Sequence, residues 1–298
     1  MKLRLFSLAT TFVVLVFSTA ALGQSANARL PHQAVHDSPA STPQILYHGG
    51  PVMVQNNHIY VIYYGSFSPT TTDVIDTFLE NLGGSGAYGV NSTYYNGQGQ
   101  YITNAPNSLV YARTSDSYYD AYSLGHTMKG KSIANEVQSV LQNGHLLPDN
   151  NGIYLLITSP DVTVPSNYCG YHTYSTTMIP GYIIKYAFSP DPAPPTYNYC
   201  SGNISTFGDT TSPNEDVGAD SVADTLIHEI SETVTDPNIS AWYTKNGYEN
   251  GDLCNFVYGQ TFLAPNGSHA NHVFGPRNYL VQTIWVNTGA GSCALSYP

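Results

Sequence analysis

Residues 220–235 read DSVADTLIHEISETVT, and this stretch determines the architecture that the rest of the chain has to accommodate. Apolar side chains recur at every fourth position, which places them on one side of a helix that packs against a core. They are Val222, Leu226, Ile230 and Val234. Asp220 and Ser221 are suitable capping residues at the start of this helix, and Pro237 ends it.

A second face of the same helix carries ionisable side chains at the same spacing, namely Asp224, His228 and Glu232. Side chains at positions i and i+4 lie one above the other, so His228 and Glu232 can bind one cation between them. The pattern resembles the H-E-x-x-H helix of metallopeptidases, with Glu in place of the second His. By that resemblance His228 and Glu232 are metal ligands, and Glu229 is the general base that activates a water molecule.

A third ligand is expected downstream, where Glu249 and Asp252 lie 21 and 24 residues after His228. The choice between them stays open. Residues 209–252 hold ten acidic residues and one basic residue, and a bound cation would neutralise part of this charge. We expect one divalent ion, zinc first, with calcium or manganese as alternatives because two carboxylates make the site harder than most zinc sites.

Helical and extended patterns alternate along the chain from residue 45 onward. Helical periodicity covers residues 72–82 and 132–141, and buried strands are expected at 58–64, 152–158, 181–188 and 279–286. This order favours an α+β fold with a mixed sheet packed against helices. We expect one domain over residues 45–298 with zincin (metallopeptidase)-like architecture and two lobes around a cleft.

The N-terminus carries the features of an export signal. Residues 1–23 combine two early basic residues, an apolar stretch and small residues near position 23, as in a secretory signal peptide. Residues 24–44 are polar and rich in Pro, Ser and Ala, which indicates a flexible lead. We therefore expect a secreted, extracellular protein, in the periplasm or cell wall if it is retained, with no membrane attachment once the signal is removed.

Four cysteines agree with an exported protein, and four cysteines allow three pairings. We favour Cys169–Cys200 and Cys254–Cys293, because each of these pairs closes a loop of moderate length. A thiolate metal site is the alternative, but the chain contains no C-x-x-C spacing.

Composition excludes two classes of partner. The chain has 298 residues, 9 basic against 20 acidic residues and a formal net charge of −11. Nucleic acid and anionic membranes both require clustered basic residues, which this chain lacks. The oligomeric state is not indicated.

Several segments together resemble the Exordium / phosphate-induced protein family of secreted proteins. These segments, in chain order, are 47–52 (YHGGPV), 59–65, 169–172 (CGYH), 218–220, 227–232 (IHEISE), 235–238 (TDPN), 241–243, 252–254 and 279–282. The family's His-Glu-x-x-Glu matches here at His228, Glu229 and Glu232, and its later acidic residue matches at Asp252. The resemblance implies an extracellular or cell-wall location, and it brings no settled biochemical activity.

Two further histidines occur in these segments. His172, in 169–172, is a candidate for an additional ligand or a substrate-binding group, or for a structural hydrogen-bonding residue. His48, in 47–52, is a weaker candidate for the same functions, because Gly49, Gly50 and Pro51 around it also form a turn.

Two hypotheses follow from the sequence. The first is a metal-dependent, peptidase-like hydrolase that acts on a peptide or cell-wall substrate. The second is a noncatalytic extracellular or wall-associated protein in which the metal site is structural.

Overall fold

The computed structural model describes residues 44–164, 168–192 and 198–298. The predicted signal peptide over residues 1–23 and all but the last residue of the predicted lead over 24–44 lie outside the described residues. Within the described part of the chain, no helix is both long and apolar enough to cross a membrane.

The helices are α1 (Pro69–Glu80), α2 (Gly86–Gly89), α3 (Ser132–Gln142), α4 (Gly202–Ser205) and α5 (Val217–Thr235), with short 3₁₀ turns η1 (Val90–Thr93), η2 (Asn198–Cys200) and η3 (Asp252–Cys254). The strands are β1 (Leu46–Tyr47), β2 (Asn57–Tyr64), β3 (Leu109–Val110), β4 (Ser117–Asp120), β5 (Gly152–Thr158), β6 (Tyr171–Ser175), β7 (Ile184–Pro190), β8 (Trp242–Tyr243), β9 (Phe262–Leu263), β10 (His269–Ala270), β11 (His272–Phe274), β12 (Arg277–Tyr279), β13 (Ile284–Val286) and β14 (Ser292–Ala294).

A six-stranded mixed sheet forms the centre of the molecule. Its order is β3-β2-β5-β7-β6, with β4 also paired to β2. The central strands β2, β5 and β7 run parallel, whereas β6 runs antiparallel to β7 at one edge. Parallel strands are buried on both faces, which is why β2 and β5 read as continuous apolar and aromatic runs.

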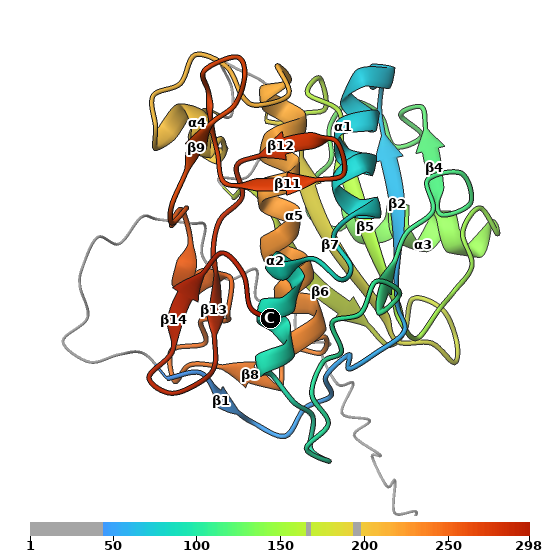
Figure 1. Ribbon diagram of the computed structural model, residues 1–298. Helices are drawn as coiled ribbons and strands as arrows, with labels where there is room; N and C mark the ends of the chain where they lie inside the picture. The colour runs from blue at the N-terminus through green and yellow to red at the C-terminus, as the bar shows by residue number, and fades with distance from the viewer. Residues whose placement is uncertain (1–43, 165–167, 193–197) are drawn as a thin grey trace, which may run out of the picture.

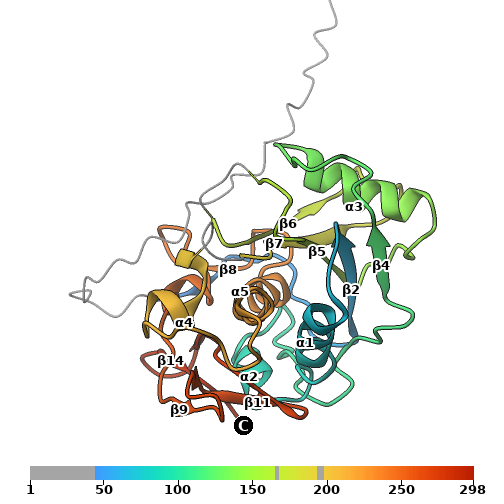
Figure 2. The ribbon, with the colours of Figure 1, turned by 90° about the horizontal axis from the view of Figure 1, so that it is seen from above.

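Each face of the sheet packs into its own apolar core, because successive side chains of a strand point to opposite faces. Ile59, Val61 and Tyr63 of β2 pack on the side of α1 and α5. Tyr60, Ile62 and Tyr64 pack on the side of α3. Figure 2 shows the resulting layers, with α3 on one side of the sheet and both α1 and α5 on the other.

Helix α5 is covered on two sides. It lies between the sheet and the small C-terminal hairpins, β11–β12 and β13–β14, as Figure 1 shows. Every residue from Gly218 to Thr235 is buried. A surface helix would keep its charged face in water, so the acidic face of this helix has been placed inside the protein, where unpaired charge is strongly unfavourable.

The structure confirms the α+β class, the mixed sheet, the predicted helices near α1, α3 and α5, and the strands near β2 and β5. Three details of the sequence-based prediction are wrong. Helix α5 begins at Val217, and its capping residue is Asp216, whose side chain accepts from the backbone N–H of Ala219. The strand expected over 181–188 corresponds to β7, which begins at Ile184 and not at residue 181.

The strand expected over 279–286 is also wrong, because this stretch is divided between β12 and β13. The backbone N–H of Gln282, between the two strands, donates to the Asp224 carboxylate instead of to a neighbouring strand. The zincin-like architecture and the two lobes remain predictions.

Both predicted disulfides are present, Cys169–Cys200 and Cys254–Cys293. Cys169 lies three residues before His172 on β6, and Cys254 lies two residues after Asp252 in η3. Each bridge therefore fixes a segment that carries a predicted site residue. Disulfides persist in oxidising environments, so the two bridges are consistent with an extracellular protein.

Candidate metal centre

His228 and Glu232 face each other on the buried side of α5, one helical turn apart. The Nε2 atom of His228 lies 3.0 Å from the Oε1 atom of Glu232, and both side chains are almost fully buried. The i, i+4 spacing read from the sequence therefore brings the two predicted ligands together.

Gln282 fixes the orientation of the His228 ring. Its Nε2 atom donates to the carbonyl of Gly251 at 2.9 Å, which leaves its Oε1 atom as the acceptor that lies 3.1 Å from Nδ1 of His228. The Nδ1 atom of His228 therefore carries a hydrogen, and in the neutral ring the Nε2 lone pair points at Glu232. A lone pair cannot face a carboxylate at 3.0 Å without a proton or a cation between them.

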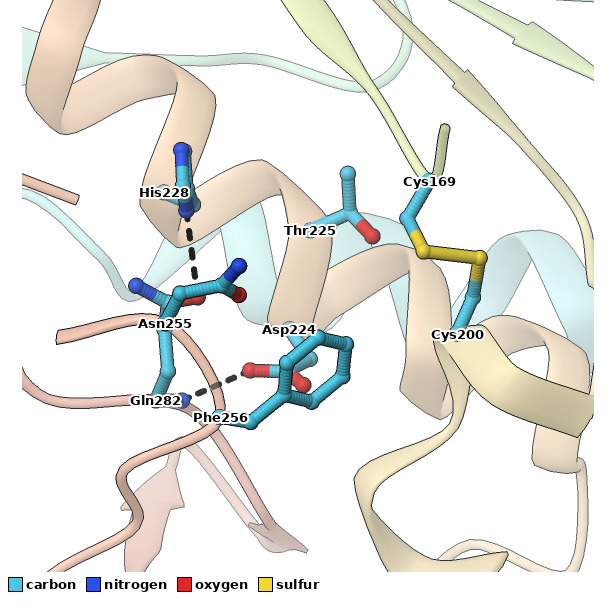
Figure 3. Close-up of a pocket in the computed structure, with 8 residues that line it drawn as sticks. All are labelled: Cys169, Cys200, Asp224, Thr225, His228, Asn255, Phe256 and Gln282. Atoms are coloured by element: carbon cyan, nitrogen blue, oxygen red, sulfur yellow. Dashed lines mark hydrogen bonds between the residues drawn. A yellow bond between two sulfur atoms is a disulfide. The ribbon is translucent and has the colours of Figure 1, made fainter. Parts of the chain in front are cut away.

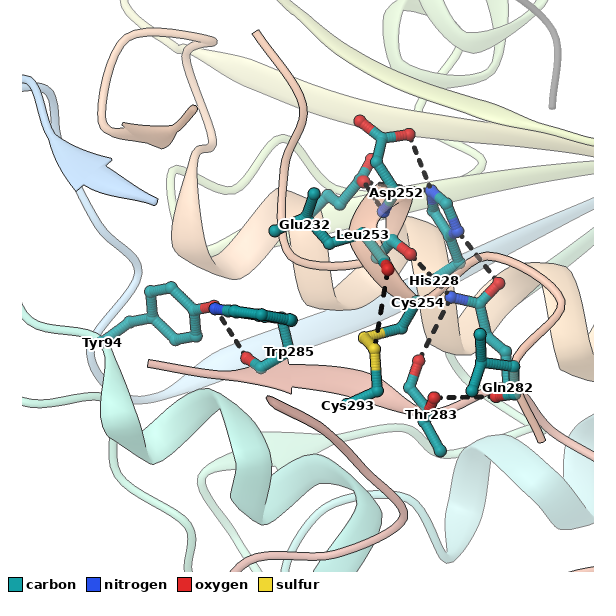
Figure 4. The surroundings of a disulfide bond; sticks show 12 residues. Tyr94, His228, Glu232, Asp252, Leu253, Cys254, Gln282, Thr283, Trp285 and Cys293 are labelled. Carbon is teal, nitrogen blue, oxygen red and sulfur yellow. Dashed lines mark hydrogen bonds and ion pairs between the residues drawn. A yellow bond between two sulfur atoms is a disulfide. The ribbon is translucent and has the colours of Figure 1, made fainter. Parts of the chain in front are cut away.

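Asp252 approaches the same side of Glu232 (Figure 4). Its Oδ1 atom lies 3.8 Å from Nε2 of His228, and its backbone N–H donates to Oε1 of Glu232 at 3.1 Å. The Asp252 side chain is 25% exposed, against 3–5% for His228 and Glu232, so it forms the side of the site nearest to solvent.

Glu249 lies on the other side of Glu232, with His172. The Nε2 atom of His172 is 3.1 Å from Oε2 of Glu249 and 3.5 Å from Oε2 of Glu232. The sequence left open whether Glu249 or Asp252 completes the site. In the structure the two carboxylates flank Glu232 from different sides, Asp252 with His228 and Glu249 with His172.

Glu229 also points into this cluster, although it is the direct neighbour of His228. Ligand-type atoms of His228, Glu229 and Glu232 lie within 4.8 Å of one another. The strand segment before His172 passes directly over Glu229, since a Cβ atom on Gly170 would lie 2.7 Å from its Oε1 atom. Only a glycine permits this close approach.

Burial and mutual repulsion shift the acidity of these groups. Burial raises the pKa of Glu229 to about 8, with His228 opposing that shift. Burial, with the charge of Glu232, likewise raises the pKa of Asp252 to about 6. Burial alone would lower the pKa of His228, but Glu232 and Glu229 outweigh it and raise this pKa well above its usual value. Each raised pKa keeps a proton on its group and so reduces the net negative charge of the cluster. A bound metal ion would reduce that charge in the same way.

A small pocket reaches the centre from the side of the Cys169–Cys200 disulfide (Figure 3). It is lined by Cys169, Cys200, Asp224, Thr225, His228, Asn255, Phe256 and Gln282. Among these lining residues, His228 is the one that also belongs to the cluster with Glu229 and Glu232.

Two of the residues that the sequence pattern singled out have other partners. Asp224 shares a helix face with His228, but it accepts hydrogen bonds from the Tyr258 hydroxyl at 2.7 Å and from the backbone of Gln282 at 2.6 Å. His48 is exposed and lies against Tyr243, with ring centroids 3.7 Å apart. The functional part suggested for His48 remains a prediction.

Sequence reasoning missed two residues of the site, Gln282 and Asp236. Asp236 is fully buried, and it lies within hydrogen-bonding reach of the Glu249 carboxyl group. Both residues belong to segments that carry the family resemblance, 235–238 and 279–282. Neither segment contains metal-ligand residues at a recognisable spacing. The contacts of Gln282 and Asp236 with the site are therefore visible only in the folded structure.

Comparison with known proteins identifies the family to which the chain belongs. The phosphate-induced protein 1 conserved region matches residues 45–295, which is most of the chain, and the protein therefore belongs to this family. Among curated proteins it is similar to Protein EXORDIUM-like 3 of Arabidopsis thaliana, with 27% identity over 273 residues, 81% of this chain and 80% of the relative. It is also similar to Protein EXORDIUM-like 5 of Arabidopsis thaliana, with 27% identity over 286 residues, 83% of this chain and 76% of the relative. No solved structure matches the chain significantly.

Proposed function

We propose that this protein is a secreted, metal-dependent hydrolase of peptidase type, with one divalent ion, zinc first, bound on α5 by His228, Glu232 and Asp252. The observation that carries the proposal is the orientation of His228, whose Nε2 atom faces Glu232 and Asp252 while Gln282 accepts from Nδ1. One imidazole and two carboxylates form a donor set that suits zinc, manganese or calcium.

Glu229 is the residue that favours catalysis over a structural site. A structural ion needs no further carboxylate beside its ligands, whereas a hydrolase needs a base within reach of the reacting water. A bound zinc ion would supply Lewis-acid chemistry by polarising a carbonyl group and lowering the pKa of water. Glu229 would accept the proton from that water and return it to the leaving amine.

The edge of the sheet supports a peptide as the substrate class. In the described part of the chain, β6 pairs with β7 on one side and leaves its other edge without a strand. An extended peptide can add to such an edge through backbone hydrogen bonds. Because β6 carries His172, a peptide bound there would run beside the cluster. A cell-wall substrate is the alternative.

One observation favours a noncatalytic function. His228, Glu229, Glu232 and Glu249 are each at most 4% exposed, as expected for an ion that only stabilises the fold. In that case the protein would be an extracellular or wall-associated component without turnover.

Glu229→Gln separates the two functions. We expect the variant to retain its metal and to lose at least 100-fold in turnover, measured with fluorescein-labelled casein and a quenched-fluorescence peptide library. Glu136→Gln on α3 is the matched control, because Glu136 is equally buried but packs on the opposite face of the sheet. Equal hydrolysis by wild type and Glu229→Gln, or none by wild type with metal bound, would contradict the catalytic proposal.

A further inference from the structure

Glu232 belongs to two groups of ligand-type atoms at once. One group contains His228 and Glu229, and the other contains His172 and Glu249. Its Oε1 atom faces His228 at 3.0 Å, and its Oε2 atom faces His172 at 3.5 Å. The two oxygens of one carboxylate therefore serve two separate sets of donors.

We propose that the protein binds a second divalent cation, held by His172, Glu249 and the Oε2 atom of Glu232, so that Glu232 bridges two ions. This inference rests on the proposed function, because the first ion is the one assigned to His228, Glu232 and Asp252. Carboxylate-bridged pairs of ions about 3.5–4 Å apart occur in several classes of hydrolase.

The spacing of the donor atoms suits an ion. Donors that surround zinc or a similar ion at about 2.0–2.2 Å lie roughly 3.0–3.5 Å from one another. The Nε2 atom of His172 lies 3.1 Å from Oε2 of Glu249 and 3.5 Å from Oε2 of Glu232, and all three side chains are only 5% exposed.

Asp236 adds a further buried carboxyl group beside the proposed second site. This residue is 0% exposed, and apart from the Glu249 carboxyl group its Oδ2 atom has no hydrogen-bond partner among the described residues. Its carboxyl group lies within reach of Glu249 and close enough to His172 for their charges to interact. Its Oδ1 atom is already taken, since it accepts from the backbone of Ser240 and Ala241.

Charge balance leads to the same result. The cluster contains five buried or partly buried carboxyl groups and two imidazoles: Asp236, Glu229, Glu232, Glu249, Asp252, His172 and His228. Across the described ranges, no lysine or arginine forms an ion pair with any of these carboxylates. With all five carboxyl groups ionised and both imidazoles neutral, two divalent ions would reduce the charge from −5 to −1, whereas one would leave −3.

Metal counting tests the second site. The full secreted chain is stripped with a chelator, reloaded with zinc chloride, dialysed and measured by mass spectrometry, alongside His228→Ala, Glu249→Gln and the control Glu136→Gln. We expect two equivalents in wild type and in the control, and one equivalent in each of the two site variants. Glu249→Gln keeps the side-chain volume, and the Glu249 backbone N–H that donates to Asp252 is unchanged.

The following results would reject the second site, and some of them would also reject the proposed function. One equivalent in wild type that is lost only in His228→Ala rejects the second site and leaves the proposed function intact. One equivalent that is lost in both variants also rejects it, because a single ion then spans both groups. One equivalent lost only in Glu249→Gln, or no bound metal at all, rejects both proposals.

Cobalt provides a test on the wild-type protein alone, so the result does not depend on the folding of a variant. Two Co²⁺ ions that share a carboxylate couple magnetically, so we expect the paramagnetic resonance signal per ion to fall between one and two equivalents added to wild type. A signal that stays proportional to added cobalt up to two equivalents would show isolated ions and would overturn the bridge.

Discussion

The Nδ1 atom of His228 lies 3.1 Å from the side-chain oxygen of Gln282, a residue 54 positions later in the chain. Gln282 also donates to the carbonyl of Gly251 and, through its backbone, to Asp224. A single residue therefore connects the helix that carries His228 with the loop that carries Asp252.

Gln282→Leu removes the acceptor for Nδ1 of His228 while keeping a side chain of similar size. Partners of this kind typically contribute 10- to 100-fold in metal affinity, and we expect a loss of about that size, measured by competition with a chromogenic zinc chelator. Thr283→Val, at the adjacent and equally buried position, is the control. Unchanged affinity in Gln282→Leu would show that the ring orientation does not depend on this contact.

Gly251→Ala introduces a methyl group against the two central residues of the site. Its Cβ atom would lie 2.8 Å from the His228 ring and 3.0 Å from Oε1 of Glu232, although its φ of −72° suits any residue. We expect a loss of about 1–3 kcal/mol in the free energy of unfolding, measured by urea titration, together with weaker zinc binding. Gly97→Ala is the control, because its Cβ would meet only the Tyr47 side chain. Equal behaviour of the two variants would contradict the close packing over His228.

Glu136 produces a pH dependence that is separate from the metal centre. Burial, with the charge of Asp120, raises its pKa from 4.5 to about 7. Folded protein holds this proton to higher pH than the unfolded chain does, so stability falls as the pH rises from about 4.5 to about 7. We expect Glu136→Gln to match wild type at pH 4 and to be more stable at pH 8, in thermal unfolding of the metal-free protein. A difference that is constant with pH would refute this.

The two disulfides close loops of 31 and 39 residues, which corresponds to about 4 kcal/mol each in the chain-entropy model. We expect the double variants Cys169→Ala/Cys200→Ala and Cys254→Ala/Cys293→Ala to lose stability by about that amount in urea unfolding. In addition, the first pair should weaken zinc binding at the second site, because Cys169 fixes the strand of His172. Losses below about 1 kcal/mol would indicate a denatured state that is compact without the bridges.

The sequence predicted local features well and distant contacts poorly. The spacing of His228, Glu229 and Glu232 is a property of one helix, so their convergence could be read directly. The positions of Asp252 and Glu249 on different sides of Glu232 depend on how a loop crosses the helix, and no spacing encodes that crossing. Spacing along one helix also does not tell whether its acidic face is solvated or buried. Its burial depends on the hairpins β11–β12 and β13–β14, which come from residues 272–294.

The double covering of α5 has a consequence for the order of folding. The helix can form locally, but its ionisable face stays in water until the chain beyond residue 250 has folded over it. Any fragment or nascent chain that ends before Gln282 therefore exposes these carboxyl groups and cannot orient His228. The donor atoms come together only when the whole chain has folded. A cation that binds them would therefore stabilise the folded, full-length chain and not shorter fragments.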